Sequence, residues 1–237
     1  MSDTSRPGKR PHRRSGSPQA CEDLDQLDTF RSTWYIVDPT HDCFIGLVLG
    51  QLLLGTLGVL AITSEFSSGM VRATFAAVPR RPLVLAAKAA VLGAVTLAVG
   101  EASAFAAFYA GQAVLNAPAP HAALGQPGVL RAVLMAGAYP ALIAVIGLGL
   151  GAVVRHTAGA ICVLVGVLFV LPLLFAPLSA SVQNASKNFL PHPMANALTA
   201  AKPLAHTLPP GLVFGLLCAY AIGALAAGAC ALTRRDA

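Results

Sequence analysis

The sequence predicts an all-α polytopic membrane protein, a bundle of about five transmembrane helices that follows a short polar segment. Of the 237 residues, 56% are hydrophobic and 11% are charged, whereas an ordinary soluble domain has about 25% charged residues. Residues 1–42 hold six basic and seven acidic side chains, and residues 43–237 hold ten basic and three acidic ones. So few charges cannot solvate a globular surface as large as residues 43–237 would form. This excludes a soluble enzyme, a disordered regulator and a secreted scaffold.

Five apolar runs within residues 43–237 predict the membrane spans. Each is long enough to cross about 30 Å of hydrocarbon at about 1.5 Å per residue. The first run, residues 43–63, contains no charged residue, and the second, residues 83–115, contains only Lys88 and Glu101. The remaining runs cover residues 132–154, 158–178 and 211–232.

Three segments are not spans. Residues 1–42 are polar and are expected to be disordered. Residues 64–82 mix polar and apolar side chains and end in two prolines within a short stretch. Residues 179–210 contain five prolines, so they cannot form a straight helix across the membrane. We expect a surface or re-entrant element there.

The positive charges predict an orientation, because loops that remain in the cytoplasm collect Lys and Arg. One set of connections carries the basic residues Arg72, Arg80, Arg81, Arg155, Arg234 and Arg235. The opposite set includes residues 116–128, which contain no Lys or Arg. The first set is therefore predicted to be cytoplasmic, together with the C-terminus. Alternation of the spans then places residues 1–42 outside, although they carry six basic residues.

Motifs for catalysis, metals or cofactors are not found in the sequence. It has no nucleotide-binding loop, no hydrolase signature and no paired carboxylates. The five cysteines form no CxxC pair, and the six histidines, which we expect to be solvated loop residues, have no ligand spacing. The basic residues are scattered between apolar runs, so no nucleic-acid partner is predicted. We expect no enzymatic activity, no metal and no cofactor in this chain.

Glu101 is the only acidic residue within a predicted span. A charge at that depth is costly, so the side chain should face the bundle interior, pair with a partner or be protonated. Two interpretations stay open: a residue of a substrate pathway or conformational lock, and a neutral carboxyl that is hydrogen-bonded to a neighbouring helix. Glycine pairs four residues apart predict close helix packing, at Gly46/Gly50, Gly147/Gly151 and Gly211/Gly215.

The segment after the first run has an amphipathic pattern. Glu65 stands beside two serines at its start, where an acidic residue favours a helix N-terminus. Phe66 and Phe75 contribute to its apolar side, and Arg72 lies opposite. The pattern by itself favours an interfacial helix that lies on lipid over a docking helix for a cytoplasmic partner.

Residues 47–90 read LVLGQLLLGTLGVLAITSEFSSGMVRATFAAVPRRPLVLAAKAA, and the portion ITSEFSSGM…VPRRP…AAK is the distinctive part. This stretch closely resembles a permease subunit of actinobacterial ABC transporters of the type 2 exporter class. The similarity continues through residues 99–115, 148–174 and 216–237. The resemblance implies a multi-pass subunit of the plasma membrane, driven by a separate cytoplasmic ABC ATPase subunit and paired with a second permease copy or a paralogue.

The resemblance also assigns roles to particular residues. It makes residues 65–82 the coupling segment, and it favours a docking interface for the ATPase made by Glu65, Phe66, Arg72, Phe75, Arg80 and Arg81. The family pattern has six spans, and residues 43–63 would be its second. Residues 30–37 look like the start of the first span, but Asp38-Pro39 follows at once. We hypothesise that the first span is lost by an internal deletion. A truncated, non-transporting permease remnant and a secondary transporter are the alternative functions.

Overall fold

The computed structural model describes residues 46–68, 81–114, 124–175, 188–200 and 207–234, together with residues 177 and 179. All of these belong to one unit, Asp38–Ala237. The predicted polar segment 1–42 lies outside the described residues.

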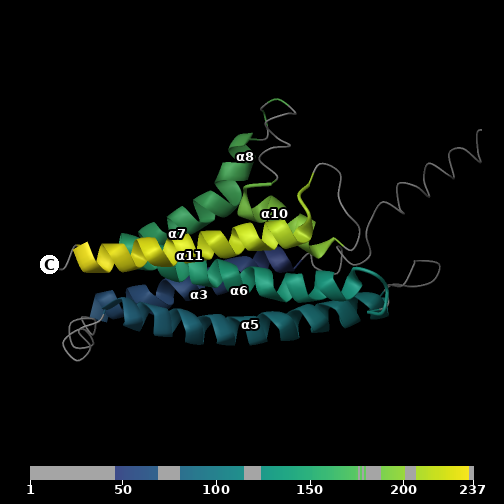
Figure 1. The fold of residues 1–237 in the computed structure, drawn as a ribbon, viewed down its shortest axis with the longest axis horizontal. Helices are drawn as coiled ribbons and strands as arrows, with labels where there is room; N and C mark the ends of the chain where they lie inside the picture. The colour runs from purple at the N-terminus through teal and green to yellow at the C-terminus, as the bar shows by residue number, and fades with distance from the viewer. Residues whose placement is uncertain are drawn as a thin grey trace, which may run out of the picture. The chain divides into compact units, whose positions relative to one another are not determined.

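The described part of the chain is all-α, as predicted, and its long helices lie side by side as a bundle (Figure 1). Five helical stretches are long and apolar enough to cross a membrane, which agrees with the predicted number of spans. The chain is therefore a multi-pass membrane protein. The helices are α3 (Leu47–Ser68), α5 (Arg81–Val114), α6 (Val129–Val154), α7 (Thr157–Val165) continued by a π-helical turn (Gly166–Val170) and α8 (Leu171–Phe175), α10 (Pro191–Thr199) and α11 (Pro210–Arg234).

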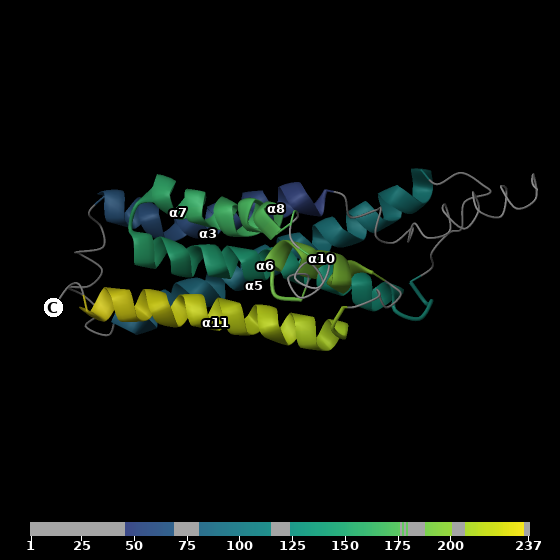
Figure 2. The ribbon, with the colours of Figure 1, turned by 90° about the horizontal axis from the view of Figure 1, so that it is seen from above.

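Helix α6 occupies the centre of the bundle (Figures 1 and 2). In its apolar window 61% of the residues are buried, against 17–33% in the other four membrane helices. It packs against α3, α5, α7, α10 and α11. Many of its buried residues are small, among them Ala136, Gly137, Ala144 and Gly147. Small side chains let neighbouring backbones approach closely, and this explains how one helix contacts five others.

The contacts of α6 with its neighbours are contacts between backbones. A methyl group added at Gly58 of α3 would lie 1.9 Å from the carbonyl oxygen of Ala144 in α6. One added at Gly100 of α5 would lie 2.4 Å from the carbonyl oxygen of Gly137, also in α6. Since packed interiors leave no room for such an overlap, these glycines determine how closely the spans approach.

The fourth membrane helix contains the π-helical turn between α7 and α8. There the N–H of Leu171 donates to the carbonyl of Gly166, five residues earlier in the chain. Pro172 follows directly and has no N–H, so regular α-helical bonding to the carbonyl of Leu168 is lost. Figure 1 shows α8 directed away from α11, and α10 packs against the turn, α6 and α11.

Helix α10 stands where the proline-rich sequence predicts a surface or re-entrant element. It begins with Pro191 at its first position, where the missing N–H costs nothing. Six of its nine residues are buried, and Met194 and Leu198 are 0% exposed. A short helix with so much of its surface covered is part of the packed bundle.

Candidate functional site

Three polar side chains from three helices form a hydrogen-bonded chain at the end of the bundle where α10 lies. Tyr139 of α6 is 0% exposed, and its hydroxyl donates to Oε1 of Gln51 in α3 across 2.5 Å. Gln51 is 1% exposed, and its Nε2 lies 3.3 Å from Nδ1 of His192 in α10. This chain of residues, here called the Gln51 network, ties α10 to two membrane helices.

The hydrogen bonds of the Gln51 network determine the protonation state of the His192 ring. The amide oxygen of Gln51 accepts from Tyr139, so its amide nitrogen donates to His192. Nδ1 of His192 is therefore an acceptor, and the ring is neutral. Burial lowers the pKa of His192 below its ordinary value, which favours the same form. The ring also packs against Phe169 with a centroid distance of 5.4 Å.

The prediction that the histidines are solvated loop residues is wrong for His192 and incomplete for His156. The side chain of His156 caps the start of α7 by accepting from the N–H of Gly159. The sequence prediction also missed Gln51 and Tyr139. A signal for Gln51 was present, because an amide inside an apolar span requires a hydrogen-bond partner.

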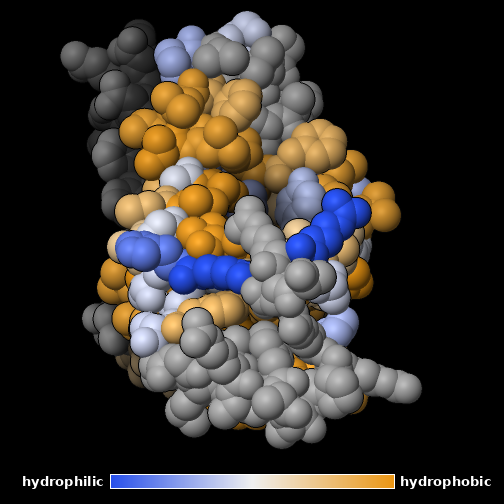
Figure 3. Space-filling model, turned by 90° about the vertical axis from the view of Figure 1, so that its left-hand side faces the viewer, coloured by the Kyte–Doolittle hydropathy of each residue, from blue (hydrophilic) through white to orange (hydrophobic). Residues whose placement is uncertain are grey.

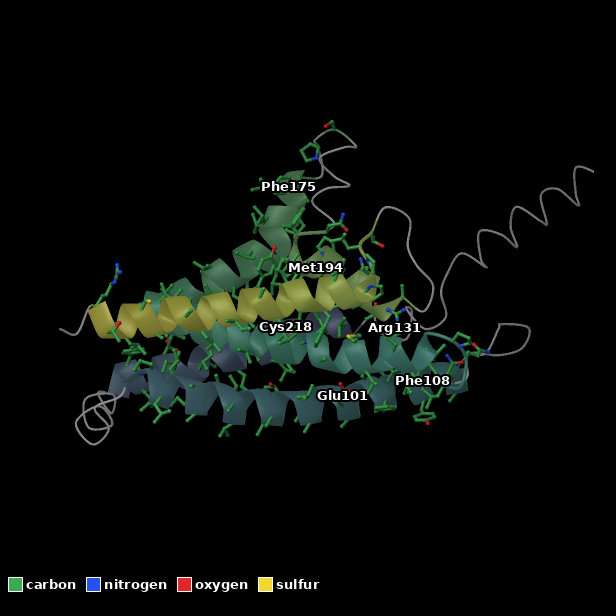
Figure 4. The ribbon with its side chains drawn as sticks, in the orientation of Figure 1. Glu101, Phe108, Arg131, Phe175, Met194 and Cys218 are labelled. Atoms are coloured by element: carbon green, nitrogen blue, oxygen red, sulfur yellow. The ribbon has the colours of Figure 1, made fainter. Side chains whose placement is uncertain are left out.

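The other end of α10 is held by Arg131 at the start of α6. Its Nη2 donates to the carbonyl oxygen of Ala200 across 3.0 Å, at the residue that ends α10. Figure 4 shows Arg131 and Met194 at the same end of the bundle. The segments that flank α10 are bonded as well, since the N–H of Leu208 donates to Oδ1 of Asn188 across 3.0 Å. Both ends of α10 are thus anchored by long-range hydrogen bonds.

The opposite end of the bundle is held by charged side chains. Lys88 of α5 forms an ion pair with Glu65 of α3, and its Nζ also donates to the carbonyl of Ala61 across 3.1 Å. The guanidinium of Arg155 lies 5.4 Å from the ring centroid of Phe66. We call these four side chains, Glu65, Lys88, Phe66 and Arg155, the charged clamp. Figure 3 views this end and shows hydrophilic residues gathered on it.

Arg155 extends the charged clamp to α11. Its Nη2 donates to the carbonyl of Ala231 across 3.1 Å, in the last turn of α11 where carbonyls lack helical partners. Arg155 itself ends α6 in a left-handed conformation with φ of 58°, and its N–H donates to the carbonyl of Gly151. One residue therefore connects the ends of α3, α6 and α11.

The predicted coupling residues are only in part among the described residues. Glu65 and Phe66 lie at the end of α3, where both contact other helices of the same chain. Arg72, Phe75 and Arg80 lie outside the described residues. Arg81 is the first residue of α5, and its backbone alone is described.

Glu101 lies near the middle of α5 (Figure 4). A methyl group added at Gly137 of α6 would meet both the backbone and the carboxyl carbon of Glu101 at 2.7 Å. The carboxyl group thus lies against the central helix. Its Oε2 is buried and has no hydrogen-bond partner among the described residues.

The predicted glycine pairs fall into two groups. Gly147 and Gly151 of α6 face α3: a methyl group at Gly147 would lie 2.4 Å from the carbonyl oxygen of Gly55, and one at Gly151 would lie 2.6 Å from Ile62. The other four have nothing within 4 Å of such a methyl group, namely Gly46, Gly50, Gly211 and Gly215. The tightest contact, at Gly58, falls outside the prediction, because no glycine lies four residues before or after Gly58.

A cavity of about 330 Å³ lies between α3 and α5, with α6 behind it. Its walls are formed by residues at the start of α3 and in the second half of α5, and by two residues of α6. They are Gly46 just before α3, Leu47, Gly50, Leu53, Leu54, Val99, Gly100, Ser103, Ala104, Ala107, Ala136 and Pro140. Nearly all of these residues are apolar, and Ser103 is the polar side chain among them.

Within the described ranges, no group of three or more His, Cys, Asp or Glu side chains is placed to hold a metal ion. No protein-family model, curated protein or solved structure matches the chain.

Proposed function

We propose that the chain is the membrane-spanning permease subunit of an ATP-driven exporter of the ABC type, located in the plasma membrane with its C-terminus in the cytoplasm. A separate cytoplasmic ATPase subunit supplies the hydrolysis of ATP, and this chain moves the substrate. The proposal rests on the resemblance of residues 47–90 to such permeases and on the arrangement at the charged clamp.

The charged clamp is the observation that carries the proposal. The predicted coupling segment, residues 65–82, runs from the last turn of α3 to the first residues of α5. At that same end Lys88 joins α5 to α3, and Arg155 joins α6 to α3 and α11. A force applied to the coupling segment by an ATPase would therefore reach four membrane helices at once, as mechanical coupling requires.

The outer face of α5 supports the proposal that a second permease copy completes the transporter. Small residues recur there at every fourth position over about two turns and are exposed; they are Ala90, Ala94 and Ala98. Rows of small residues at this spacing allow two membrane helices to approach closely. In a cysteine-free background, Ala98→Cys is expected to form a disulfide between two copies in membranes. Leu173→Cys, on the exposed side of α8, is the control and should not.

Co-purification with the ATPase subunit tests the coupling. We expect Arg72→Asp and Phe75→Asp to weaken binding of the ATPase subunit, because both replace a predicted contact with an acidic group. Arg234→Asp is the matched control, since Arg234 is exposed in the last turn of α11 and lies outside the coupling segment. Equal binding by all three correctly inserted variants would contradict the proposal.

Flux measurements separate the alternative functions. Export that requires ATP and follows no ion gradient supports the permease, and export driven by an ion gradient indicates a secondary transporter. A chain that binds the ATPase subunit and supports no flux in either condition is a truncated remnant.

A further inference from the structure

The cavity between α3 and α5 is elongated along the membrane helices. Its lining residues run from Gly46, just before α3, to Leu54 of α3, and from Val99 to Ala107 on α5. Each stretch rises about 12 Å at about 1.5 Å per residue. The cavity therefore extends parallel to the spans, which is the direction in which lipid acyl chains lie in a bilayer.

The cavity opens toward lipid. Two of its lining side chains are large, apolar and exposed, with Leu53 69% exposed and Val99 48% exposed. Both residues belong to helices that are long and apolar enough to span the membrane. The medium beside the opening is hydrocarbon, so a soluble ligand or a cytoplasmic protein does not reach it.

The volume and the lining suit a hydrocarbon ligand. About 330 Å³ falls at the small end of the range for ligand pockets, about 300–1,000 Å³. Leaving such an apolar cavity empty would forfeit dispersion contacts on all its walls, and water would find few polar partners there. Filling it with a chain of methylene groups restores the contacts and requires no hydrogen bond.

The cavity also has a small polar locus. The hydroxyls of Thr56, Thr63 and Thr96 donate to carbonyls of the preceding helical turn, whereas the described structure has no hydrogen bond for Ser103. Pro140 has no N–H, so the carbonyl of Ala136 lacks its usual helical donor. Ser103 and Ala136 both line the cavity. The Ser103 hydroxyl supplies a donor and the Ala136 carbonyl supplies an acceptor within an otherwise apolar wall.

We propose that the cavity between α3 and α5 is a binding site for one acyl chain of a membrane phospholipid. The chain enters from the bilayer and lies along the two spans, and the ester or hydroxyl group of the lipid reaches Ser103. This site is independent of the ATPase and of transport, so it goes beyond the proposed function and stands if that function fails.

Photolabelling tests the site. The purified protein is placed in vesicles of phosphatidylethanolamine and phosphatidylglycerol that contain a small fraction of phosphatidylglycerol with a diazirine in one acyl chain. After irradiation, labelled residues are identified by mass spectrometry. We expect labelling of residues 99–107 to exceed that of Leu212 and Ile222, which are exposed on α11 and report contact with bulk lipid.

Two matched glycine variants decide the outcome. Gly50→Leu adds a bulky side chain to the cavity wall, and Gly215→Leu adds the same side chain to an exposed face of α11. Both positions have nothing within 4 Å of an added methyl group, so both variants should fold. We expect labelling of residues 99–107 to fall about tenfold, equivalent to about 1.4 kcal/mol of affinity, in Gly50→Leu and to stay unchanged in Gly215→Leu.

Two results would overturn the proposal. The first is uniform labelling of α5 and α11, or equal labelling in the two variants, since either would mean that the lipid contact is that of an ordinary surface. The second is an efficient disulfide between two copies through Leu53→Cys, since a second copy would then cover the opening.

Discussion

The two ends of the bundle are held together by different chemistry. At one end the charged clamp joins the spans by an ion pair and an arginine that lies over an aromatic ring. At the other end the Gln51 network joins α3, α6 and α10 by neutral side chains, and Gln51 and Tyr139 are almost completely buried. The charged end keeps contact with water, because the side chains of Glu65 and Lys88 are each about a quarter exposed, at 27% and 26%.

This difference has a mechanical consequence. An ion pair that keeps contact with water is screened by salt, and its charged groups can be solvated when the pair separates. The charged clamp can therefore rearrange more easily than a fully buried contact when a partner pulls on it. A buried hydrogen bond is costly to break, because the groups left behind lose both partner and solvent. The Gln51 network should therefore hold α10 firmly while the opposite end moves.

The largest expected effect is on the stability of the whole bundle, both ends included. It comes from the backbone contact of α3 with α6. Gly58→Ala places a methyl group where the carbonyl oxygen of Ala144 lies 1.9 Å away, and backbone cannot move aside as a side chain can. We expect a loss of about 3 kcal/mol or more in the free energy of unfolding, measured by denaturant titration in detergent micelles. Gly215→Ala, which meets no atom within 4 Å, should unfold like the natural protein; a similar loss in both variants would contradict the prediction.

The second effect is confined to the end with α10. Tyr139→Phe removes the donor to Gln51 and leaves a buried amide oxygen unsatisfied, at a cost of about 1–3 kcal/mol. We expect α10 to detach more often, which is measured as faster labelling of a cysteine introduced at the buried position Ala197. Tyr109→Phe, on the exposed face of α5, is the control. Unchanged labelling in Tyr139→Phe would show that the network does not hold α10.

The sequence predicts where the spans lie, but it does not predict which spans contact one another. The apolar run predicts a span over residues 132–154, within three residues of α6, Val129–Val154, because bilayer thickness restricts the length of an apolar run. The partners of each span could not be predicted in this way. Gly147 and Gly215 both belong to pairs of glycines with the same spacing, yet the first lies against Gly55 and the second faces open space. That distinction depends on the rotation of each helix, which apolar composition leaves undetermined.

The polar site was harder to predict for a related reason. Gln51 and Tyr139 are separated by 88 positions in the chain, and Gln51 and His192 by 141. No local pattern reports contacts over such separations. What sequence does indicate is that Gln51, as an amide within an apolar span, requires a partner. The identity of its two partners follows only from how α6 and α10 pack beside α3.

The third effect is a pH dependence at the α10 end. Burial lowers the pKa of His192 while α10 is packed in the bundle, here called the closed state. The open state, in which α10 has detached, therefore binds more protons. The closed state loses stability relative to the open state as the pH falls. The loss begins near the ordinary pKa of histidine, about 6.5, and is complete below the lowered pKa of the closed state. The effect should be smaller than that of Tyr139→Phe, because the bond between Tyr139 and Gln51 remains.

Labelling of a cysteine at Ala197 measures this pH dependence when it is divided by labelling of a cysteine at the exposed neighbour Asn196. The ratio cancels the titration of the thiol itself. We expect the ratio to rise as the pH is lowered from about 7.5 to about 5.5, on either side of the ordinary histidine pKa, and to be constant in His192→Asn. A ratio that rises equally in His192→Asn would assign the effect to another group.

The smallest effect belongs to the charged clamp and tests the proposed contrast most directly. A double-mutant cycle with Glu65→Gln and Lys88→Met isolates the energy of the ion pair, and we expect about 0.5 kcal/mol at low salt. Because both side chains keep contact with water, the value should shrink further as added salt screens the charges. The same cycle applied to Gln51→Leu and Tyr139→Phe should give a larger coupling that salt leaves unchanged, since no charge is involved. If the ion pair proved the stronger of the two and insensitive to salt, the clamp would be the rigid end, and the coupling segment would be connected to the part of the bundle least able to move.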